Sequence, residues 1–448
     1  MRRWRNRDRN DREARTGRAA GPAGAGGRGA AGRNHEAHAR PGTATGAPTG
    51  AAPHPATQSP AARRPGTATG APTGAAPHPA TQSPAARRAG TATQSPAARR
   101  RPARGGGRRW RRTLTALVLT TAVVAGTVGW AAGNGERPVT GPPPGSGAWR
   151  ADTSLGRALP DPATATPRDI AAFFRTLGPA QRRDLAHRHP SVVGNLDGAP
   201  VALRYEANAT ALRHDARFAH LAGRRILAFD PRGRGQVAEV FGDLAPGNRV
   251  AVVVPGSDID AGSYDRRTDP YGTPAGMAKQ LRAAAPGTAV IAWAGYTTPV
   301  GVGLDAATGE LAEAGAVRLA RLTEGLAALG TPAPAVFCHS YGSVVCGLAA
   351  PRLRARDLVV LGSPGMRAGT VADLGTDARV WAAKDPSDWI SRVPNVHLLG
   401  LGHGTDPASP EFGARPVPAT DADGHTGYFA PGTESLRTFA AIAGGDAR

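Results

Sequence analysis

Short apolar runs alternate with segments of helical periodicity over the second half of the chain. After residue 248 these runs are almost continuously apolar, which is typical of strands buried on both faces of a parallel sheet. Helical patterns fill the intervals at residues 274–285, 310–329 and 342–353, and a last helix is predicted at 433–443. The alternation predicts a three-layer α/β domain with a mostly parallel sheet over residues 223–448. Its predicted strands cover residues 225–229, 236–241, 249–254, 288–293, 333–337, 357–361, 379–383 and 396–401.

The region before the predicted sheet has a helical pattern from residue 168 to residue 222. Its first helix has apolar residues on one face and ends before Pro190, and a second helix is predicted at about 205–221. Residues 133–167 are rich in Pro, Gly and Ala and are predicted to be a linker that lifts the globular part off a membrane.

An uncharged run of 20 residues, 113–132, is long enough to cross a bilayer as a helix. Eight arginines lie just before it, within residues 99–112. The positive-inside rule therefore places residues 1–112 in the cytoplasm and the predicted α/β domain outside. We expect a single-pass anchor in the cell membrane. The alternative is a signal peptide cut after Ala131, followed by secretion, although 112 preceding residues are far more than an ordinary signal peptide has.

Positive charge is concentrated in the tail, residues 1–112. The tail has 23 arginines against four acidic residues, a net charge of +19 out of +21 for the whole chain, so the rest carries only +2. This distribution excludes a uniformly basic nucleic-acid-binding fold. The tail contains a 24-residue repeat and almost no large apolar residues, so we expect it to be disordered. It is a candidate contact for anionic lipid or nucleic acid.

Cys338 and Cys346 are the only cysteines. Their eight-residue separation crosses a predicted turn from strand to helix, which makes a disulfide between them improbable. We expect both to be small packing residues.

Residues 335–343, AVFCHSYGS, predict a nucleophile on a sharp turn between a buried strand and a helix. Ser340 is the candidate nucleophile, and Gly342 provides the small side chain that such a turn needs, whereas Cys338 stands where glycine is usual. The backbone N–H of Tyr341, at the start of the helix, is a candidate oxyanion donor. The second donor is expected in the loop after residues 249–254, from either Gly256 or Ser257.

A catalytic acid and a histidine should follow the nucleophile in that order. Asp388 is our candidate acid because Trp389 and Ile390 can bury it, and Asp385 is the alternative, unless it caps the turn. His425, in a glycine-flanked loop before the last helix, is our candidate base. His403 is its competitor, and His397, inside a predicted strand, is expected in the core.

Several motifs occur in order between residues 190 and 444: PSVVGNLDGAP (190–200), FDP (229–231), VPG (254–256), AWAGY (292–296), HSYG (339–342), GSPGM (362–366) and HTGYF (425–429). Together they resemble an actinobacterial α/β-hydrolase family that has long been catalogued as a domain of unknown function. The resemblance implies the α/β-hydrolase fold and a triad of Ser340, Asp388 and His425. It implies no substrate.

The sequence therefore predicts a serine hydrolase of the esterase or lipase type, acting on a small-molecule or lipid ester through an acyl-enzyme intermediate. The alternative is a non-catalytic envelope or binding protein with the same fold. We expect no metal or other cofactor, because His403 and Asp406 are too few to compose a metal site and no phosphate-binding loop is present.

Overall fold

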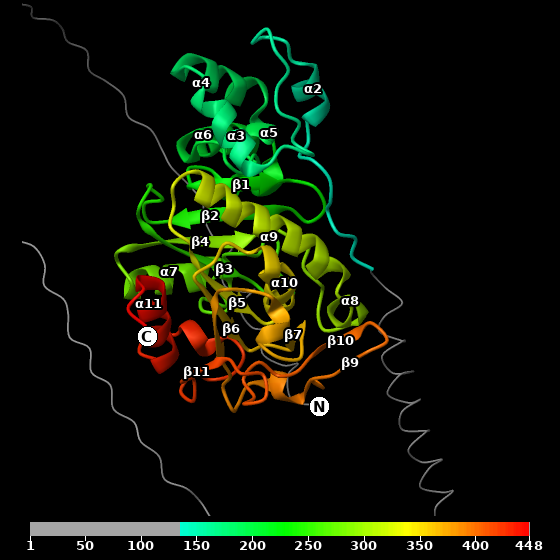
Figure 1. The fold of residues 1–448 in the computed structure, drawn as a ribbon, viewed down its shortest axis with the longest axis vertical. Coiled ribbons are helices and arrows are strands. Elements are labelled where there is room, and N and C mark those ends of the chain that lie inside the picture. The colour runs from blue at the N-terminus through cyan, green and yellow to red at the C-terminus, as the bar shows by residue number, and fades with distance from the viewer. Residues whose placement is uncertain (1–134, 448) are drawn as a thin grey trace, which may run out of the picture. The chain divides into compact units, whose positions relative to one another are not determined.

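An eight-stranded sheet forms the centre of this computed structural model, which describes residues 135–447 (Figure 1). The strand order is β1-β2-β4-β3-β5-β6-β8-β11. β2 pairs antiparallel with β1 and β4, and the six strands from β4 to β11 are parallel. This confirms the predicted α/β class with a mostly parallel sheet. The strands are β1 (Ile226–Asp230), β2 (Gln236–Phe241), β3 (Arg249–Val254), β4 (Thr288–Ala294), β5 (Ala335–His339), β6 (Asp357–Leu361), β8 (Arg379–Ala383) and β11 (Arg415–Val417).

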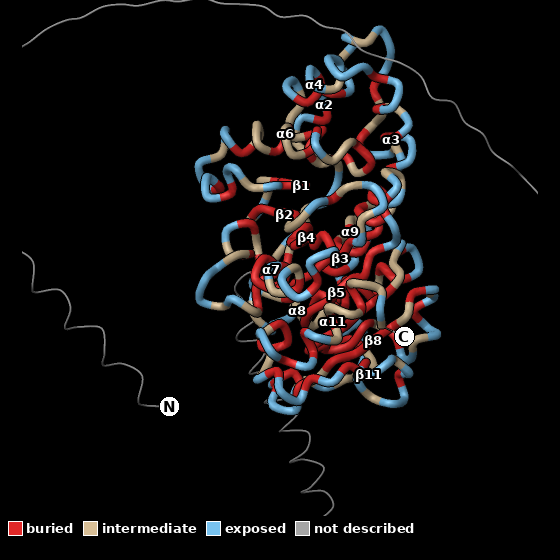
Figure 2. The backbone as a smooth tube through the Cα atoms, turned by 90° about the vertical axis from the view of Figure 1, so that its left-hand side faces the viewer, coloured by how far each residue is buried: buried red, intermediate tan, exposed pale blue. Residues whose placement is uncertain are grey.

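Helices cover both faces of the sheet. α9 (Glu310–Ala328) and α10 (Gly342–Ala349) pack together on one face, and α7 (Pro274–Ala284) and α11 (Glu434–Gly444) pack together on the other. Successive side chains of a strand enter opposite cores: Val336 belongs to the core under α9 and α10, and Phe337 to the core under α7 and α11. Figure 2 shows this buried centre as red tube.

A small helical lobe precedes the sheet. Its α3 packs on α9, and its α6 packs on β1 of the sheet. A glycine and a proline, Gly178 and Pro179, divide the predicted first helix into α3 and α4. The lobe has its own buried cluster, which includes Trp149, Phe174 and Leu185. Its elements are α2 (Ser146–Ala151), α3 (Pro167–Arg175), α4 (Pro179–Arg188), α5 (Pro190–Val193), α6 (Val201–Leu212) and η1 (Ala216–Leu221).

Part of the stretch that we predicted as a linker, 133–167, belongs to this lobe, because Trp149 and Leu159 lie in its buried cluster. It forms α2, whose Trp149 is completely buried and donates its indole N–H to the carbonyl oxygen of Pro160 at 2.7 Å. The buried Trp149 anchors this segment in the core of the lobe, although its Pro and Gly content alone suggested a spacer.

The predicted strand 396–401 is also different in the structure. It is a hairpin of β9 (His397–Leu398) and β10 (Leu401–Gly404), which joins β7 (Gly365–Ala368) in a separate small sheet. His397, which we expected in the core, is exposed. The main sheet ends instead at β11, a three-residue strand that contains Pro416, as an edge strand can. The remaining short elements are α8 (Leu304–Ala307), η2 (Ala350–Arg352), η3 (Ala372–Leu374), η4 (Trp389–Arg392) and η5 (Gly427–Phe429).

Among residues 135–447, no helix combines the length and the apolar character that crossing a membrane requires. The predicted membrane segment, 113–132, and the basic tail, 1–112, lie outside the described residues.

Contrary to our expectation, Cys338 and Cys346 form a disulfide, with their Cα atoms 6.4 Å apart. α10 folds back over β5 after the turn, and this brings its second turn alongside the end of the strand. The sequence separation did not reveal this approach, because it depends on how the helix packs on the strand.

We therefore predict that the full chain, unfolded without reductant, exposes no thiol to an alkylating reagent, and exposes two after reduction. Replacing both cysteines by alanine should lower the free energy of unfolding by about 2–3 kcal/mol, because the short closed loop no longer restricts the unfolded chain. Thiol counting and urea titration measure the two effects. Two reactive thiols before reduction would contradict the disulfide.

Candidate active site

Ser340 lies in the turn between β5 and α10, with a left-handed backbone at φ 53°. This conformation is uncommon for a residue with a side chain and is found where the surrounding structure enforces it. The chain reverses so tightly here that a Cβ on Gly342 would lie 2.7 Å from the carbonyl oxygens of Val254 and Pro255. Only glycine fits at position 342, so the predicted requirement for a small residue has a direct cause.

The backbone of Ser340 is fixed from the neighbouring strand. Its N–H donates to the carbonyl oxygen of Leu361, the last residue of β6, at 3.0 Å. Ser343 closes the first turn of the helix by donating its N–H to the carbonyl oxygen of Ser340 at 2.9 Å. Both bonds hold the serine at the carboxyl edge of the sheet, where ligand sites of α/β proteins form.

The loop after β3 lies against the nucleophile. A Cβ on Gly256 would be 2.5 Å from Cβ and 2.9 Å from Oγ of Ser340, so the bare backbone of this residue faces the serine. Within the described residues the N–H groups of Gly256, Ser257 and Tyr341 donate to no other group. These three N–H groups are those predicted as oxyanion donors. Tyr341 follows Ser340 in sequence, and Gly256 lies against it in space.

Buried and strained groups fix this loop in place. The hydroxyl of Tyr296 donates to the carbonyl oxygen of Pro255 at 2.8 Å. Asp258 has a left-handed backbone at φ 64°, donates its N–H to the carbonyl oxygen of Pro299, and accepts from the N–H of Gly301, both at 2.8 Å. The loop after β4 therefore supports the loop that borders the nucleophile.

Asp388 and His425 form a direct pair. Nδ1 of His425 lies 2.8 and 3.0 Å from the two carboxylate oxygens of Asp388. The Asp388 side chain is fully buried, and it also accepts from the N–H of Ile390 at 2.8 Å and from the hydroxyl of Tyr428 at 2.7 Å. Sequence reasoning missed Tyr428, although it lies three residues after the candidate histidine in the HTGYF motif.

The hydrogen bonds decide the charge state of Asp388. Burial acts to raise the pKa of its carboxyl group, but the bonds from His425, Ile390 and Tyr428 outweigh burial and hold the pKa below its usual value. Asp388 is therefore a carboxylate at neutral pH. It fixes the proton of His425 on Nδ1 and leaves Nε2 as the nitrogen available to a nucleophile.

The three side chains converge on the end of β6. A Cβ on Gly362 would lie 2.9 Å from Oδ2 of Asp388 and 3.1 Å from Nδ1 of His425. The preceding residue, Leu361, holds the backbone of Ser340. Ser340 Oγ and His425 form no hydrogen bond among the described residues, and such bonds commonly tighten only when substrate is bound.

A family model described as alpha/beta hydrolase matches residues 230–398. This part of the chain has the α/β-hydrolase fold. The match includes β5, Ser340 and Asp388, and the strand order agrees with it. The hydrolase fold that the sequence motifs implied is thereby confirmed.

Two curated proteins of Mycobacterium tuberculosis, from strains CDC 1551 and H37Rv, are similar to this hydrolase, and each is described as an uncharacterized protein. Both are 28% identical to it over 376 residues, which cover 64% of this chain and 57% of the relative. The chain thus spans little more than half the length of these relatives.

Solved structures that match part of this chain include carboxyl esterase 2 from the fungus Tuber melanosporum, with 12% identity and a TM-score of 0.31, covering 54% of this chain and 97% of that one. An α/β serine hydrolase without a lid, from Xanthomonas campestris, has 15% identity and a TM-score of 0.27, and the match covers 47% of this chain and 88% of that one.

The alternative acid, Asp385, and the alternative base, His403, form hydrogen bonds outside the pair of Asp388 and His425. Asp385 accepts from the N–H of Ser387 at 2.6 Å and from its hydroxyl, so it closes the turn after β8 and does not contact His425. His403 is buried in β10, with Nε2 2.6 Å from the carbonyl oxygen of Ala306, and burial lowers its pKa to about 4. The structure thus brings Asp388 and His425 together, and neither alternative joins them.

His339, directly before the nucleophile, supports the histidine loop. Its Nε2 lies 2.7 Å from the carbonyl oxygen of His425, and the two rings are 4.7 Å apart between centroids. Burial, followed by the nearby charge of His425, lowers the pKa of His339 to about 3. His339 is therefore neutral and donates Nε2–H to the loop. Sequence reasoning missed this contact, which joins residues far apart in the chain.

We predict that this hydrolase loses stability on acidification through His339. The unfolded histidine titrates near 6.5 and the folded one near 3, so the unfolded state binds the extra proton between these values. Stability from this group is complete above pH 6.5 and falls as the pH drops. Between pH 7 and pH 5 the wild type should lose about 1–2 kcal/mol more of its free energy of unfolding than His339→Gln does. Parallel pH profiles in urea titrations would contradict a buried neutral His339.

We also predict that Gly256→Ala greatly reduces hydrolytic turnover at Ser340. The added Cβ would meet Ser340 at 2.5 Å and push the loop away from the nucleophile, and loss of one oxyanion donor costs about 10²–10³-fold in kcat. Gly287→Ala is the matched control, because no atom lies within 4 Å of its Cβ position. Equal activity of the two variants would show that the loop after β3 contributes no donor.

Proposed function

We propose that this α/β hydrolase is a serine esterase that cleaves carboxylic esters through an acyl-enzyme intermediate. The observation that carries the proposal is the left-handed Ser340, at the carboxyl edge of the sheet, next to the buried pair of Asp388 and His425. This is the arrangement that activates a serine hydroxyl. A non-catalytic binding protein with the same fold is the competing proposal.

In the proposed reaction, Oγ of Ser340 attacks the ester carbonyl carbon while Nε2 of His425 accepts the hydroxyl proton. Negative charge develops on the former carbonyl oxygen and is met by the N–H groups of Tyr341 and of Gly256 or Ser257. The bond to the alkoxy oxygen then breaks, and His425 returns the proton to the leaving alcohol. Water, activated by the same histidine, releases the acid and regenerates Ser340. Asp388 remains a carboxylate throughout and stabilises the protonated ring.

We further propose that the enzyme acts outside the cytoplasm, tethered by residues 113–132 or secreted after cleavage of this segment. The uncharged run and the eight preceding arginines support this location. The disulfide between Cys338 and Cys346 also fits an oxidising compartment. On the cytoplasmic side, the basic tail stays a candidate contact for anionic lipid or nucleic acid.

A fluorophosphonate probe tests the nucleophile in the full-length chain. We expect covalent labelling of the wild type at Ser340 and none of Ser340→Ala. On a soluble short-chain ester, Ser340→Ala and His425→Gln should each lose turnover by roughly 10³–10⁴-fold or more. Labelling that persists in Ser340→Ala would exclude this residue as the nucleophile.

A matched pair of variants tests the acid. Asp388→Asn removes the charge that fixes the His425 tautomer and should lose roughly 10⁴-fold in kcat. Asp385→Asn changes an equally buried carboxylate that does not contact His425, and it should retain most of the activity. A wild type that is folded but neither labelled nor active would favour the non-catalytic alternative.

A further inference from the structure

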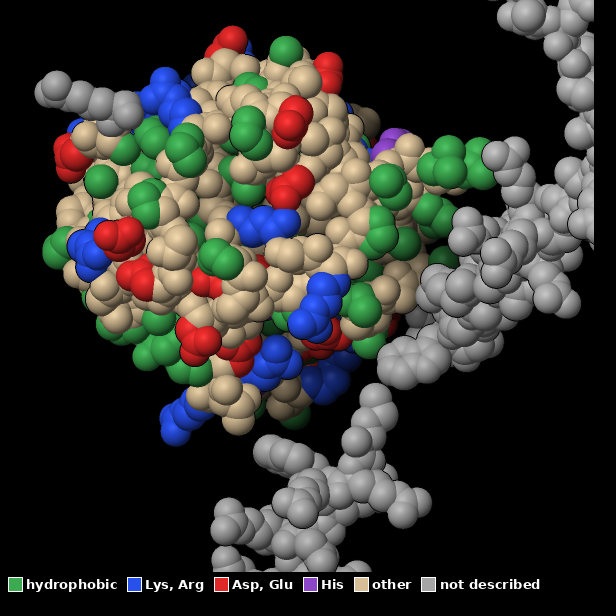
Figure 3. Space-filling model, turned by 90° about the horizontal axis from the view of Figure 1, so that it is seen from below, with side chains coloured by type: hydrophobic (Ala, Val, Ile, Leu, Met, Phe, Trp, Pro, Cys, Tyr) green, Lys and Arg blue, Asp and Glu red, His purple; other side chains and the backbone are tan. Residues whose placement is uncertain are grey.

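Large apolar side chains are exposed on two neighbouring segments at the carboxyl edge of the sheet. We call them the apolar rim, and its most exposed member is Leu399, at 93%. Figure 3 shows hydrophobic side chains gathered on a protruding part of the surface, at the right of that view. The apolar rim consists of Val300, Val302 and Leu304, in and after the loop that follows β4, and Val396, Leu398, Leu399 and Leu401, in the β9–β10 hairpin.

The two segments of the apolar rim are held together. α8 packs against β10, and Nε2 of His403 in β10 lies 2.6 Å from the carbonyl oxygen of Ala306 in α8. Arg367 in β7 contacts the hairpin at two points. One guanidinium nitrogen lies 2.9 Å from Nε2 of His397, and another donates to the carbonyl oxygen of Gly400 at 3.1 Å. The hairpin that carries the exposed leucines is therefore held by hydrogen bonds, although nothing among the described residues covers these side chains.

The apolar rim borders the active site. The hydroxyl of Tyr341, the residue after the nucleophile, donates to the carbonyl oxygen of Thr308 just after α8, at 3.2 Å. On the other side, the segment that carries the hairpin starts at Asp388 and Trp389, and the Trp389 ring lies 4.6 Å from the His425 ring between centroids. Both segments of the apolar rim are therefore joined directly to residues of the active site.

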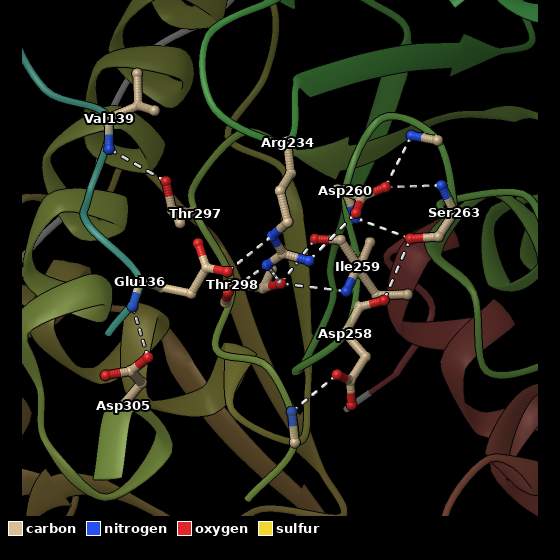
Figure 4. Close-up of polar contacts among 12 residues, drawn as sticks. Glu136, Val139, Arg234, Asp258, Ile259, Asp260, Ser263, Thr297, Thr298 and Asp305 are labelled. Atoms are coloured by element: carbon tan, nitrogen blue, oxygen red, sulfur yellow. Dashed lines mark hydrogen bonds and ion pairs between the residues drawn. The ribbon is translucent and has the colours of Figure 1, made fainter. Parts of the chain in front are cut away.

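The first described residues are bonded to one segment of the apolar rim. We call residues 135–145 the strap. The strap is tied to the same loop (Figure 4): the N–H of Glu136 donates to Asp305 of α8 at 2.8 Å, and its carboxylate lies 3.4 Å from Arg234. The N–H of Val139 donates to Oγ1 of Thr297 at 3.1 Å.

Chain length then limits the distance to the membrane. The predicted membrane segment ends at Ala132, four residues before Glu136. Four residues reach at most about 14 Å even when fully extended. Since Glu136 is bonded to α8, a chain anchored through residues 113–132 holds Leu304 and its neighbours in the apolar rim within about 20 Å of the hydrocarbon boundary.

We propose that the apolar rim docks on the outer surface of the bilayer and that the site beside it takes lipid esters from that leaflet. The statement about substrate rests on the proposed esterase function, whereas docking does not. The strap holds the apolar rim close to the proposed membrane anchor. Exposed aliphatic side chains can insert at the boundary between lipid head groups and acyl chains. The edge of the sheet that would dock is also the edge that carries Ser340. A lipid ester can then pass from the leaflet to the nucleophile without crossing water.

Site-directed fluorescence in nanodiscs that hold one copy of the full chain tests docking. The two native cysteines form a disulfide, so Leu399→Cys supplies the only free thiol for a fluorophore. Asp377→Cys is the control, because it is exposed and precedes β8 at the opposite edge of the sheet. We expect lipids with a spin-labelled acyl chain to quench the probe at 399 several-fold more strongly than at 377. Equal quenching at the two positions would overturn docking, and a single copy per disc excludes a second molecule as the cover.

Activity gives an independent readout. Leu398→Asp with Leu399→Asp should reduce cleavage of a long-chain diacyl ester in nanodiscs by at least tenfold, while hydrolysis of a soluble short-chain ester and fluorophosphonate labelling change less than twofold. Val317→Asp is the control for an added carboxylate, since it places one such charge on an exposed apolar position outside the apolar rim. Equal loss on both esters would overturn the substrate proposal. Quenching at 399 in a chain that cleaves neither ester would support docking and exclude the esterase function.

Discussion

The left-handed backbone of Ser340 is the constraint on which the site depends. A residue with a side chain in this conformation costs about 1–3 kcal/mol and needs surroundings that permit nothing else. Here those surroundings are the contact of Gly342 with two carbonyl oxygens at the end of β3, and the bond from Ser340 to Leu361. A fully buried β5 and the disulfide behind the turn add rigidity. The packing of the whole sheet therefore holds one hydroxyl at its edge.

Neutral buried donors arrange the loops around that hydroxyl. Tyr296 holds the loop after β3, Tyr428 holds Asp388, and His339 holds the loop of His425. Burial raises the pKa of both tyrosines and lowers that of the histidine, so each group stays uncharged. Such donors fix positions without adding charge. The carboxylate of Asp388 is therefore held by a neutral donor, Tyr428, while it pairs with His425.

Much of this arrangement follows from sequence, and the exceptions have physical causes. β3, β6 and β8 occupy their predicted ranges because strands buried on both faces are continuously apolar. The carboxyl ends of such strands meet at one edge, which is why Ser340 and Asp388 could be expected together. The apolar run at 396–401 misled us, because composition does not tell a buried strand from an exposed hairpin. The disulfide, Trp149 and the His339 contact depend on tertiary packing, which no local pattern encodes.

The strap, residues 135–145, limits how the hydrolase domain can be oriented relative to the predicted membrane segment. A flexible linker would leave the catalytic edge free to face any direction, and four exposed apolar side chains on one hairpin would then be an aggregation hazard. A strap bonded at Asp305 and Thr297 instead fixes which edge follows the chain toward residue 132. The same bonds brace the loop that contacts Asp258 and so supports Gly256 beside the nucleophile. The proposed orientation at a membrane and the geometry of the proposed oxyanion site thus both depend on one loop, residues 295–309.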